Sequence, residues 1–262
     1  MGLKGFYPWL RKKRGYIPMS RNPKYIQLPK NCKMRVDVAS FFSVIRSTYI
    51  KNTEDKTKAH QALLGHISRF GDISRMVFYV DGATAVEKKE THRKREEKRV
   101  KASQNASTAM KVLENHVSCG KIPTSRQFKD VTKALDGAFK WSHQDRRDFV
   151  AFLTQKQLDA RICDTEADVA IAVDCQKNDI VLSQDSDFLA YDTVTTLWRP
   201  VGRWRKAAKV LEYCRPNIIA KTSLSSNKLT ALCCVSHNDY TSNIERLGVA
   251  TNYKIVQSLA ED

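Results

Sequence analysis

Two short, mostly apolar runs, each followed closely by aspartate, constrain the fold of this chain more than any other feature. Met76–Val80 leads directly into Asp81, and Ile180–Ser183 is followed after one residue by Asp185. A strand that is apolar on both of its faces is typical of a parallel sheet covered on both sides. Helical patterns lie between such runs, and this alternation predicts an α/β fold with a mostly parallel sheet.

The other expected elements have weaker signals. One helix is well marked, because Ala59, Leu63 and Ile67 share one face of Thr57–Phe70. Between residues 87 and 141 the chain is polar and basic, with helical stretches interrupted near Gly120–Ser125. The remaining expected elements are strands at Met34–Ala39, Ala160–Cys163 and Thr195–Trp198, and helices at Phe41–Ile50, Arg147–Leu158 and Glu166–Cys175.

Seven carboxylates lie at or beside the ends of these elements. Sites in open α/β sheets form outside the carboxyl ends of the strands, so we expect distant positions to converge in one acidic cleft. Such a group would repel itself unless some members stayed protonated or cations were bound. Hard divalent cations take oxygen ligands, and two of them can serve a phosphoryl transfer. The seven are Asp37, Asp81, Glu166, Asp168, Asp185, Asp187 and Asp239.

Each acidic cluster also has a purely structural interpretation. An aspartate after a strand is more often a turn residue or a helix cap. Thr165 with Asp168 three residues later resembles a capping box, and Asp185 and Asp187 are compatible with a solvated loop. Only the combination of all the clusters favours metal binding.

The charge of the chain indicates its partners. The formal net charge is +17, from 45 Lys and Arg against 28 Asp and Glu, which predicts a polyanionic partner, nucleic acid ahead of membrane. No apolar run approaches the roughly 18 residues of a transmembrane helix, and no signal peptide is evident. The seven scattered cysteines predict free thiols in an intracellular protein. The run Arg11–Arg14 suits either a nuclear import signal or a DNA contact, so nuclear localisation is expected.

Three basic residues follow the Asp81 cluster at helical spacing. Lys88, Arg95 and Arg99 are seven and four residues apart, so on a helix they fall within roughly 20° of one line. A cationic ridge beside an acidic cleft suits a scissile phosphate. The alternative is a solvated, ion-paired helix, because acidic residues are interspersed, namely Glu87, Glu90, Glu96 and Glu97.

Taken together, these motifs resemble the flap endonuclease family of XPG-like, structure-specific nucleases with a PIN-like core. The resemblance runs from Met1 to about Val256. The motifs that carry it are Met1-Gly2-Leu3-Lys4-Gly5, Val36–Ser40, Phe78–Gly82, Glu166-Ala167-Asp168, Ser183–Leu189 and Leu232–Tyr240.

The resemblance implies one nuclease domain, 1–262, with a three-layer PIN-like α/β fold and a mostly parallel sheet flanked by helices. Residues 1–86 and 146–262 would form the nuclease body, ending in a divergent helix–turn–helix, and residues 87–145 a helical arch or cap. It also implies a two-metal, structure-specific 5′ nuclease of the flap endonuclease or 5′–3′ exonuclease type, using two Mg²⁺ or alternatively Mn²⁺. The expected partner is DNA with single-strand/double-strand junctions, with RNA as the alternative; no sliding-clamp motif is visible.

The same resemblance assigns roles to individual residues. Lys88 and Arg95 would act on the scissile phosphate at the base of the arch. Gly2 would lie near the active site, and Arg99 and Gly248 would bind nucleic acid. One metal would be held by Asp37, Asp81, Glu166 and Asp168, and the second by Asp185, Asp187 and Asp239 with Asp168 shared.

The chain departs from the family pattern in ways that leave a second function open. Asp168 is one methylene shorter than the family glutamate, His237 replaces a glycine near Asp239, and only Gly248 remains of a Gly-x-Gly turn. The alternative is a non-catalytic nucleic-acid-binding or RNA-regulatory protein on the same fold. Carboxylates at all seven positions favour the nuclease. Four aromatic residues near the amino terminus would either stack on bases or belong to the core, namely Tyr7, Trp9, Phe41 and Phe42.

Overall fold

The structure is a computed structural model that describes residues 3–12, 19–21, 28–83, 88–204, 207–236 and 247–260. Its described strands form one seven-stranded sheet in the order β1-β7-β6-β5-β2-β3-β4. The five strands β4, β3, β2, β5 and β6 are parallel, whereas β7 and β1 extend the sheet antiparallel. The mostly parallel sheet is therefore confirmed. The strands are β1 (Met19–Arg21), β2 (Met34–Asp37), β3 (Met76–Val80), β4 (Asp159–Ile162), β5 (Ile180–Leu182), β6 (Thr196–Trp204) and β7 (Ala207–Cys214).

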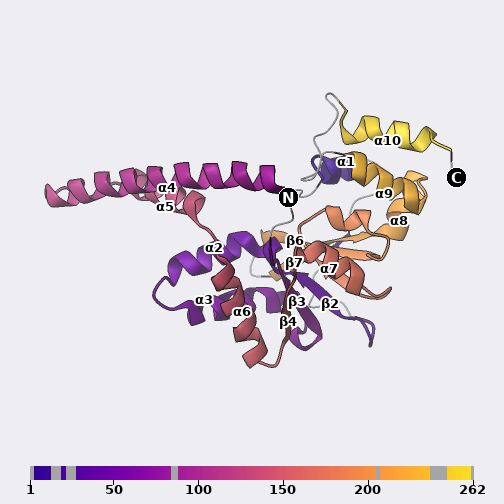
Figure 1. Cartoon of the computed structure of the whole chain (residues 1–262), viewed down its shortest axis with the longest axis horizontal. Coiled ribbons are helices and arrows are strands. Elements are labelled where there is room, and N and C mark those ends of the chain that lie inside the picture. The colour runs from indigo at the N-terminus through magenta and orange to yellow at the C-terminus, as the bar shows by residue number, and fades with distance from the viewer. Residues whose placement is uncertain are drawn as a thin grey trace.

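Helices cover both faces of the sheet, which gives the expected three layers (Figure 1). The sheet has a hydrophobic core on each face. On one face Val36, Phe78 and Leu182 pack against a first group of helices. On the other face Val77, Tyr79 and Val181 pack against a second group. The first group is α2 (Phe42–Lys51), α3 (Lys56–Ile67) and α6 (His143–Gln155); the second is α1 (Phe6–Lys12), α7 (Ala167–Asp174), α8 (Arg215–Thr222), α9 (Ser226–Val235) and α10 (Val249–Ser258).

Two helix boundaries differ from the sequence expectation for local reasons. Helix α6 begins at His143 and not at residue 147, because Ser142 and Asp145 form a reciprocal capping box. It ends at Gln155, and Gln157 has a left-handed backbone with φ of 59°. The strands expected from continuous apolar runs agree closely, since all five residues of β3 are buried.

The antiparallel end of the sheet was not predicted. The sequence indicated a strand only at Thr195–Trp198, whereas β6 extends to Trp204 and pairs along most of its length with β7. Burial along β7 does not alternate cleanly, because Val210 and Tyr213 are buried but the residues between them are half-buried. Pairing with β6 and β1 stabilises β7, and such non-local hydrogen bonds leave no local sequence pattern.

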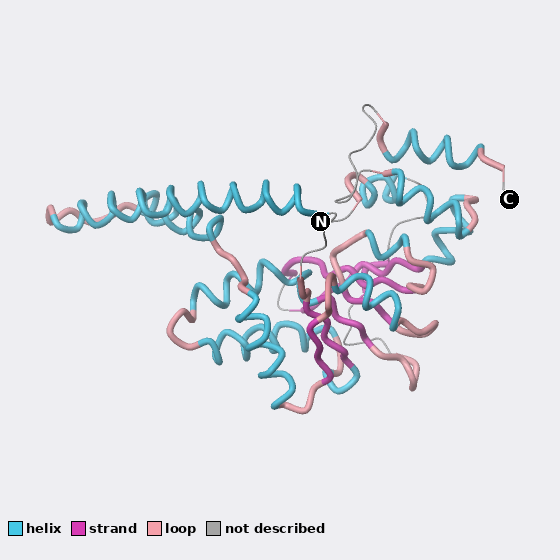
Figure 2. Tube along the Cα trace, in the orientation of Figure 1, coloured by secondary structure: helices cyan, strands magenta, loops and turns pink. Residues whose placement is uncertain are grey.

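A helical hairpin projects from the rest of the molecule (Figures 1 and 2). It consists of α4 (Lys89–Ser118) and α5 (Ser125–Ala138), and the interruption between them falls where the sequence predicted it. At about 1.5 Å per residue, the 30 residues of α4 span roughly 45 Å. Small residues allow the two helices to pack closely: a Cβ at Gly137 would lie 3.0 Å from the Cβ of Ala102.

Two further expectations concern the chain as a whole. All seven cysteines belong to the described residues and are free thiols, as predicted. Over the same residues, no helix has both the length and the apolar character that a membrane span requires.

Candidate active site

The chain order reverses at β2, which lies between β3 on one side and β5 on the other. A crevice forms at such a switch point, outside the carboxyl ends of the strands. A cleft of about 520 Å³ lies there, called the acidic cleft below. It is lined by five of the seven predicted carboxylates, namely Asp37, Asp81, Glu166, Asp168 and Asp185.

Asp37 is the most deeply buried of these carboxylates. It ends β2, and its Oδ2 accepts hydrogen bonds from the hydroxyls of Ser40 at 2.6 Å and Ser183 at 2.7 Å. Burial, together with repulsion from the Asp81 charge, raises the pKa of Asp37 to about 7. The carboxylate is therefore held rigidly, in a place where a bound cation would stabilise its ionised form.

Asp81 connects the end of β3 to the start of α7. Its Oδ1 accepts a hydrogen bond from the backbone amide of Ala167 at 2.9 Å. Gly82 donates to the carbonyl of Thr165 at 2.7 Å, and a Cβ at Gly82 would lie only 1.7 Å from the carbonyl oxygen of Cys163. This close backbone approach, which requires glycine, brings the Glu166–Asp168 turn beside Asp81.

The capping-box interpretation of Thr165 and Asp168 is wrong. The N-cap residue of α7 is Glu166, which makes no side-chain cap hydrogen bond, and Oδ1 of Asp168 accepts from the adjacent amide of Val169. Asp81 satisfies an amide of the first turn instead. Glu166 and Asp168 therefore do not serve as a capping box for α7. Both of them line the acidic cleft.

The remaining predicted acidic positions differ in their placement. Asp185 donates its backbone amide to Ser183 Oγ at 3.0 Å, and its Oδ1 accepts from the amide of Asp187 at 3.0 Å. Asp187 begins the short 3-10 helix η6 (Asp187–Ala190) and is not among the residues that line the acidic cleft. Asp239 and Gly2 lie outside the described residues, although Leu3 donates its amide to Ser186 Oγ at 2.7 Å.

All three residues of the predicted cationic ridge line the acidic cleft. Lys88, at the N-cap of α4, forms an ion pair with Glu166, and the two side chains are only 11% and 15% exposed. Arg99 pairs with Glu96 at 2.8 Å, as the alternative interpretation expected. The ridge thus contacts the cleft and is also partly ion-paired.

One cleft residue that sequence reasoning missed is Arg146. It lies in α6, and its Nη1 donates to the carbonyls of Asp81 at 2.7 Å and Gly82 at 3.0 Å. Its charge lowers the pKa of Asp81, although burial, the larger effect, raises that pKa. The Ser142–Asp145 capping pattern would have placed Arg146 in the first turn of a helix, but no sequence signal directs that turn at the cleft.

Three of the four amino-terminal aromatic residues belong to the core. Tyr7, Trp9 and Phe41 are buried in the core. Phe42 is half-buried and lines the acidic cleft, with its ring 5.8 Å from that of Phe139. Gly248 is the N-cap residue of α10, and the turn before it lies outside the described residues.

The donor chemistry of the acidic cleft fits a hard divalent cation. Burial and the charge of Glu166 raise the pKa values of Asp81 and Asp168, so a bound cation would stabilise their ionised forms. The ammonium of Lys88 already stands in as a cation on Glu166. Among the described residues, however, no three acidic, histidine or cysteine side chains converge closely enough to coordinate an ion. Metal coordination by Glu166 would require it to leave its ion pair with Lys88.

The raised pKa of Asp37 predicts a pH-dependent stability. The pKa of Asp37 is about 7 in the folded state and near 4 in the unfolded state. The folded state is therefore favoured at low pH, where Asp37 is protonated, and this stabilisation is lost as pH rises through about 7. In EDTA we expect a lower melting temperature at pH 8 than at pH 5.5, with Mg²⁺ reversing part of the fall at pH 8. Thermal unfolding of the wild type and of Asp37→Asn measures this. Equal pH dependence in the two proteins would contradict the assignment.

The sheet and the helices around it form a fold that solved structures of Rad2, GEN1 and flap endonuclease-1 share. No protein-family model matches the sequence, and no curated protein matches it significantly. Solved structures do match it over nearly the whole chain.

The catalytic core of Rad2 in complex with DNA substrate matches with a TM-score of 0.57 and 15% identity, over 97% of this chain and 67% of that chain. Human GEN1 in complex with Holliday junction DNA gives 0.55 and 13% identity, over 100% of this chain and 56% of that chain. Flap endonuclease-1 from Methanococcus jannaschii gives 0.50 and 14% identity, over 93% and 76%. At these identities the similarity shows the fold, which confirms the resemblance predicted from the motifs.

Proposed function

We propose that this chain is a metal-dependent, structure-specific nuclease that hydrolyses DNA phosphodiester bonds near single-strand/double-strand junctions, with 5′ polarity. The observation that carries the proposal is the convergence of five carboxylates and four cationic side chains on one cleft at the switch point. Matched structures of Rad2 and GEN1 are complexes with DNA, which supports DNA as the partner.

The carboxylates would hold two divalent ions, Mg²⁺ or Mn²⁺. Asp37, Asp81, Glu166 and Asp168 would hold one, and Asp185, Asp187 and Asp239 the other, with Asp168 shared. Bound there, the ions supply Lewis-acid activation of water and neutralise charge on the phosphodiester.

The cationic side chains would bind the phosphodiester itself. Lys88 would exchange its ion pair with Glu166 for the scissile phosphate. Arg95 and Arg99 reach the cleft from the same helix and bind the flanking backbone. Arg146 approaches from α6, and its contacts with the Asp81 and Gly82 carbonyls fix its direction before substrate arrives. Groups fixed in advance stabilise developing charge at little cost of reorganisation.

A specific observation favours a second candidate, a non-catalytic nucleic-acid binder. Lys88 occupies Glu166, and in the described part of the chain no three acidic side chains converge on one point. If this arrangement persisted in solution, the cleft would bind a phosphate backbone through its cations without cleaving it. RNA is the alternative substrate for either candidate.

A cleavage panel tests the proposed function. The purified chain is incubated with 5′-flap, fork, single-stranded DNA and RNA substrates in Mg²⁺, Mn²⁺ or EDTA. We expect cleavage of the junction substrates in Mg²⁺ or Mn²⁺ and none in EDTA. Salt-sensitive binding without cleavage under any condition would instead establish the non-catalytic binder.

A further inference from the structure

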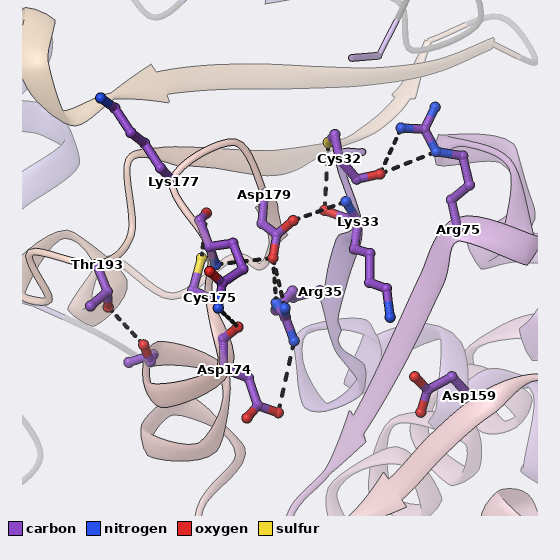
Figure 3. A network of polar contacts seen from close by, with 12 residues as sticks. Cys32, Lys33, Arg35, Arg75, Asp159, Asp174, Cys175, Lys177, Asp179 and Thr193 are labelled. Carbon is purple, nitrogen blue, oxygen red and sulfur yellow. Dashed lines mark hydrogen bonds and ion pairs between the residues drawn. The ribbon is translucent and has the colours of Figure 1, made fainter. Parts of the chain in front are cut away.

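A polar network, buried except at Asp174, whose side chain is 32% exposed, lies at the carboxyl end of α7. The Arg35 guanidinium donates from Nε to Asp179 Oδ2 at 2.8 Å and from Nη1 to the Tyr79 hydroxyl. That hydroxyl donates in turn to Asp174 Oδ2 at 2.8 Å. Figure 3 shows Arg35 between Asp174 and Asp179. These four residues are called the Arg35 network.

The network lies on the two strands that end at the acidic cleft. Arg35 is two residues before Asp37 in β2, and Tyr79 is two residues before Asp81, which follows β3. Asp174 is the last residue of α7, whose first turn lines the cleft. The network therefore ties the far end of α7 to the two strands that lead into the acidic cleft.

The near end of α7 is held separately, by the hydrogen bond from Ala167 to Asp81. A helix of eight residues is too short to be stable alone, so its position depends on its buried residues, Ala167, Ile171 and Ala172, and on the polar contacts at both ends. The far anchor is well satisfied: Asp179 also accepts from the backbone amides of Lys33 at 2.9 Å and Gln176 at 3.0 Å. Fully satisfied buried networks are rigid.

We propose that the Arg35 network positions α7 so that Glu166 and Asp168 can bind metal opposite Asp81, an inference that rests on the proposed function. Of the described residues that line the acidic cleft, none belongs to the network, so it acts through the helix and not on substrate. Loss of the far anchor lets α7 tilt about its near end, which moves both carboxylates relative to Asp81.

Tyr79→Phe tests the proposal with little change of shape. It removes the hydroxyl that bonds to both Arg35 and Asp174 and leaves the buried ring in place, while Asp174 keeps its hydrogen bond from Arg161 at 2.7 Å. Mn²⁺ binding is measured by calorimetry without nucleic acid. We expect affinity to fall roughly ten-fold, the lower end of the 10- to 100-fold cost of losing supporting contacts around a metal site.

Tyr49→Phe is the matched control. Tyr49 is also buried, and its hydroxyl is hydrogen-bonded to His60 Nε2 at 2.9 Å, on helices that cover the opposite face of the sheet. We expect both variants to lower the melting temperature to a similar extent, but only Tyr79→Phe to weaken Mn²⁺ binding.

Three outcomes overturn the proposal. Unchanged Mn²⁺ affinity in Tyr79→Phe removes the positioning role and leaves the metal site standing. An equal loss in Tyr49→Phe shows general loosening of the fold. If the wild type itself binds no Mn²⁺, the metal site of the proposed function fails, and the positioning role fails with it.

Discussion

Asp185→Ala is expected to reduce cleavage of a 5′-flap substrate by about 1,000-fold or more. Metal ions contribute several kcal/mol of transition-state stabilisation at such sites, and each 1.4 kcal/mol corresponds to about ten-fold in rate. Asp185 is a better target than Asp81, because Asp81 also accepts the Ala167 amide and so supports α7. Asp185 Oδ1 accepts from the amide of Asp187, two residues along the chain, a contact within the same turn.

The matched control is Asp192→Ala, which removes the same charge from an exposed position seven residues further along the chain. Initial rates in Mg²⁺ and in Mn²⁺ are compared for the wild type and both variants, with circular dichroism to verify folding. The assignment is supported if Asp192→Ala keeps the wild-type rate and Asp185→Ala loses it. Equal activity in all three proteins would place the chemistry elsewhere.

Asp179→Ala is expected to cost about 3–5 kcal/mol of unfolding free energy, because it leaves the buried Arg35 guanidinium without its closest carboxylate. The two side chains are 8% and 2% exposed, and Nη2 of Arg35 lies 2.7 Å from Asp179 Oδ2. Two backbone amides, those of Lys33 and Gln176, lose an acceptor in the same change. Urea unfolding at pH 7 measures the loss.

A surface ion pair offers the contrast. Asp159 lies 3.5 Å from Arg161, and both side chains are nearly half-exposed, so Asp159→Ala should cost at most about 1 kcal/mol. Replacing both partners, as Arg35→Met with Asp179→Leu, should recover part of the Asp179→Ala loss, since no buried charge remains unpaired. A loss in Asp179→Ala no larger than in Asp159→Ala would show that Arg35 finds other partners.

Elements with a strong local pattern were predicted closely. The strand at Met76–Val80 agrees at both ends, because a strand buried on both faces is apolar at every position. The helix expected at Thr57–Phe70 occurs as α3 and a short 3-10 turn, since its apolar face is periodic. The hairpin break near Gly120 could be predicted because glycine favours turns. In the structure Gly120 has a left-handed backbone, with φ of 69°.

Elements stabilised by distant partners were not predicted. Strand β7 is held by hydrogen bonds to β6 and β1, and its own burial pattern is irregular. Arg146 reaches the cleft only because α6 packs beside the end of β3. Arg35 reads in sequence as a polar interruption of a strand, yet it is buried and paired with a residue 144 positions away.

By itself the sequence determined the parallel core, the hairpin and the set of acidic residues at strand ends, because burial and periodicity act over a few neighbouring residues. Only the tertiary structure decided which carboxylates meet: Asp37, Asp81, Glu166, Asp168 and Asp185 line one cleft, and Asp187 does not. Their convergence depends on strand order, on the close backbone approach at Gly82 and on the anchoring of α7. Each of these joins residues far apart in the chain.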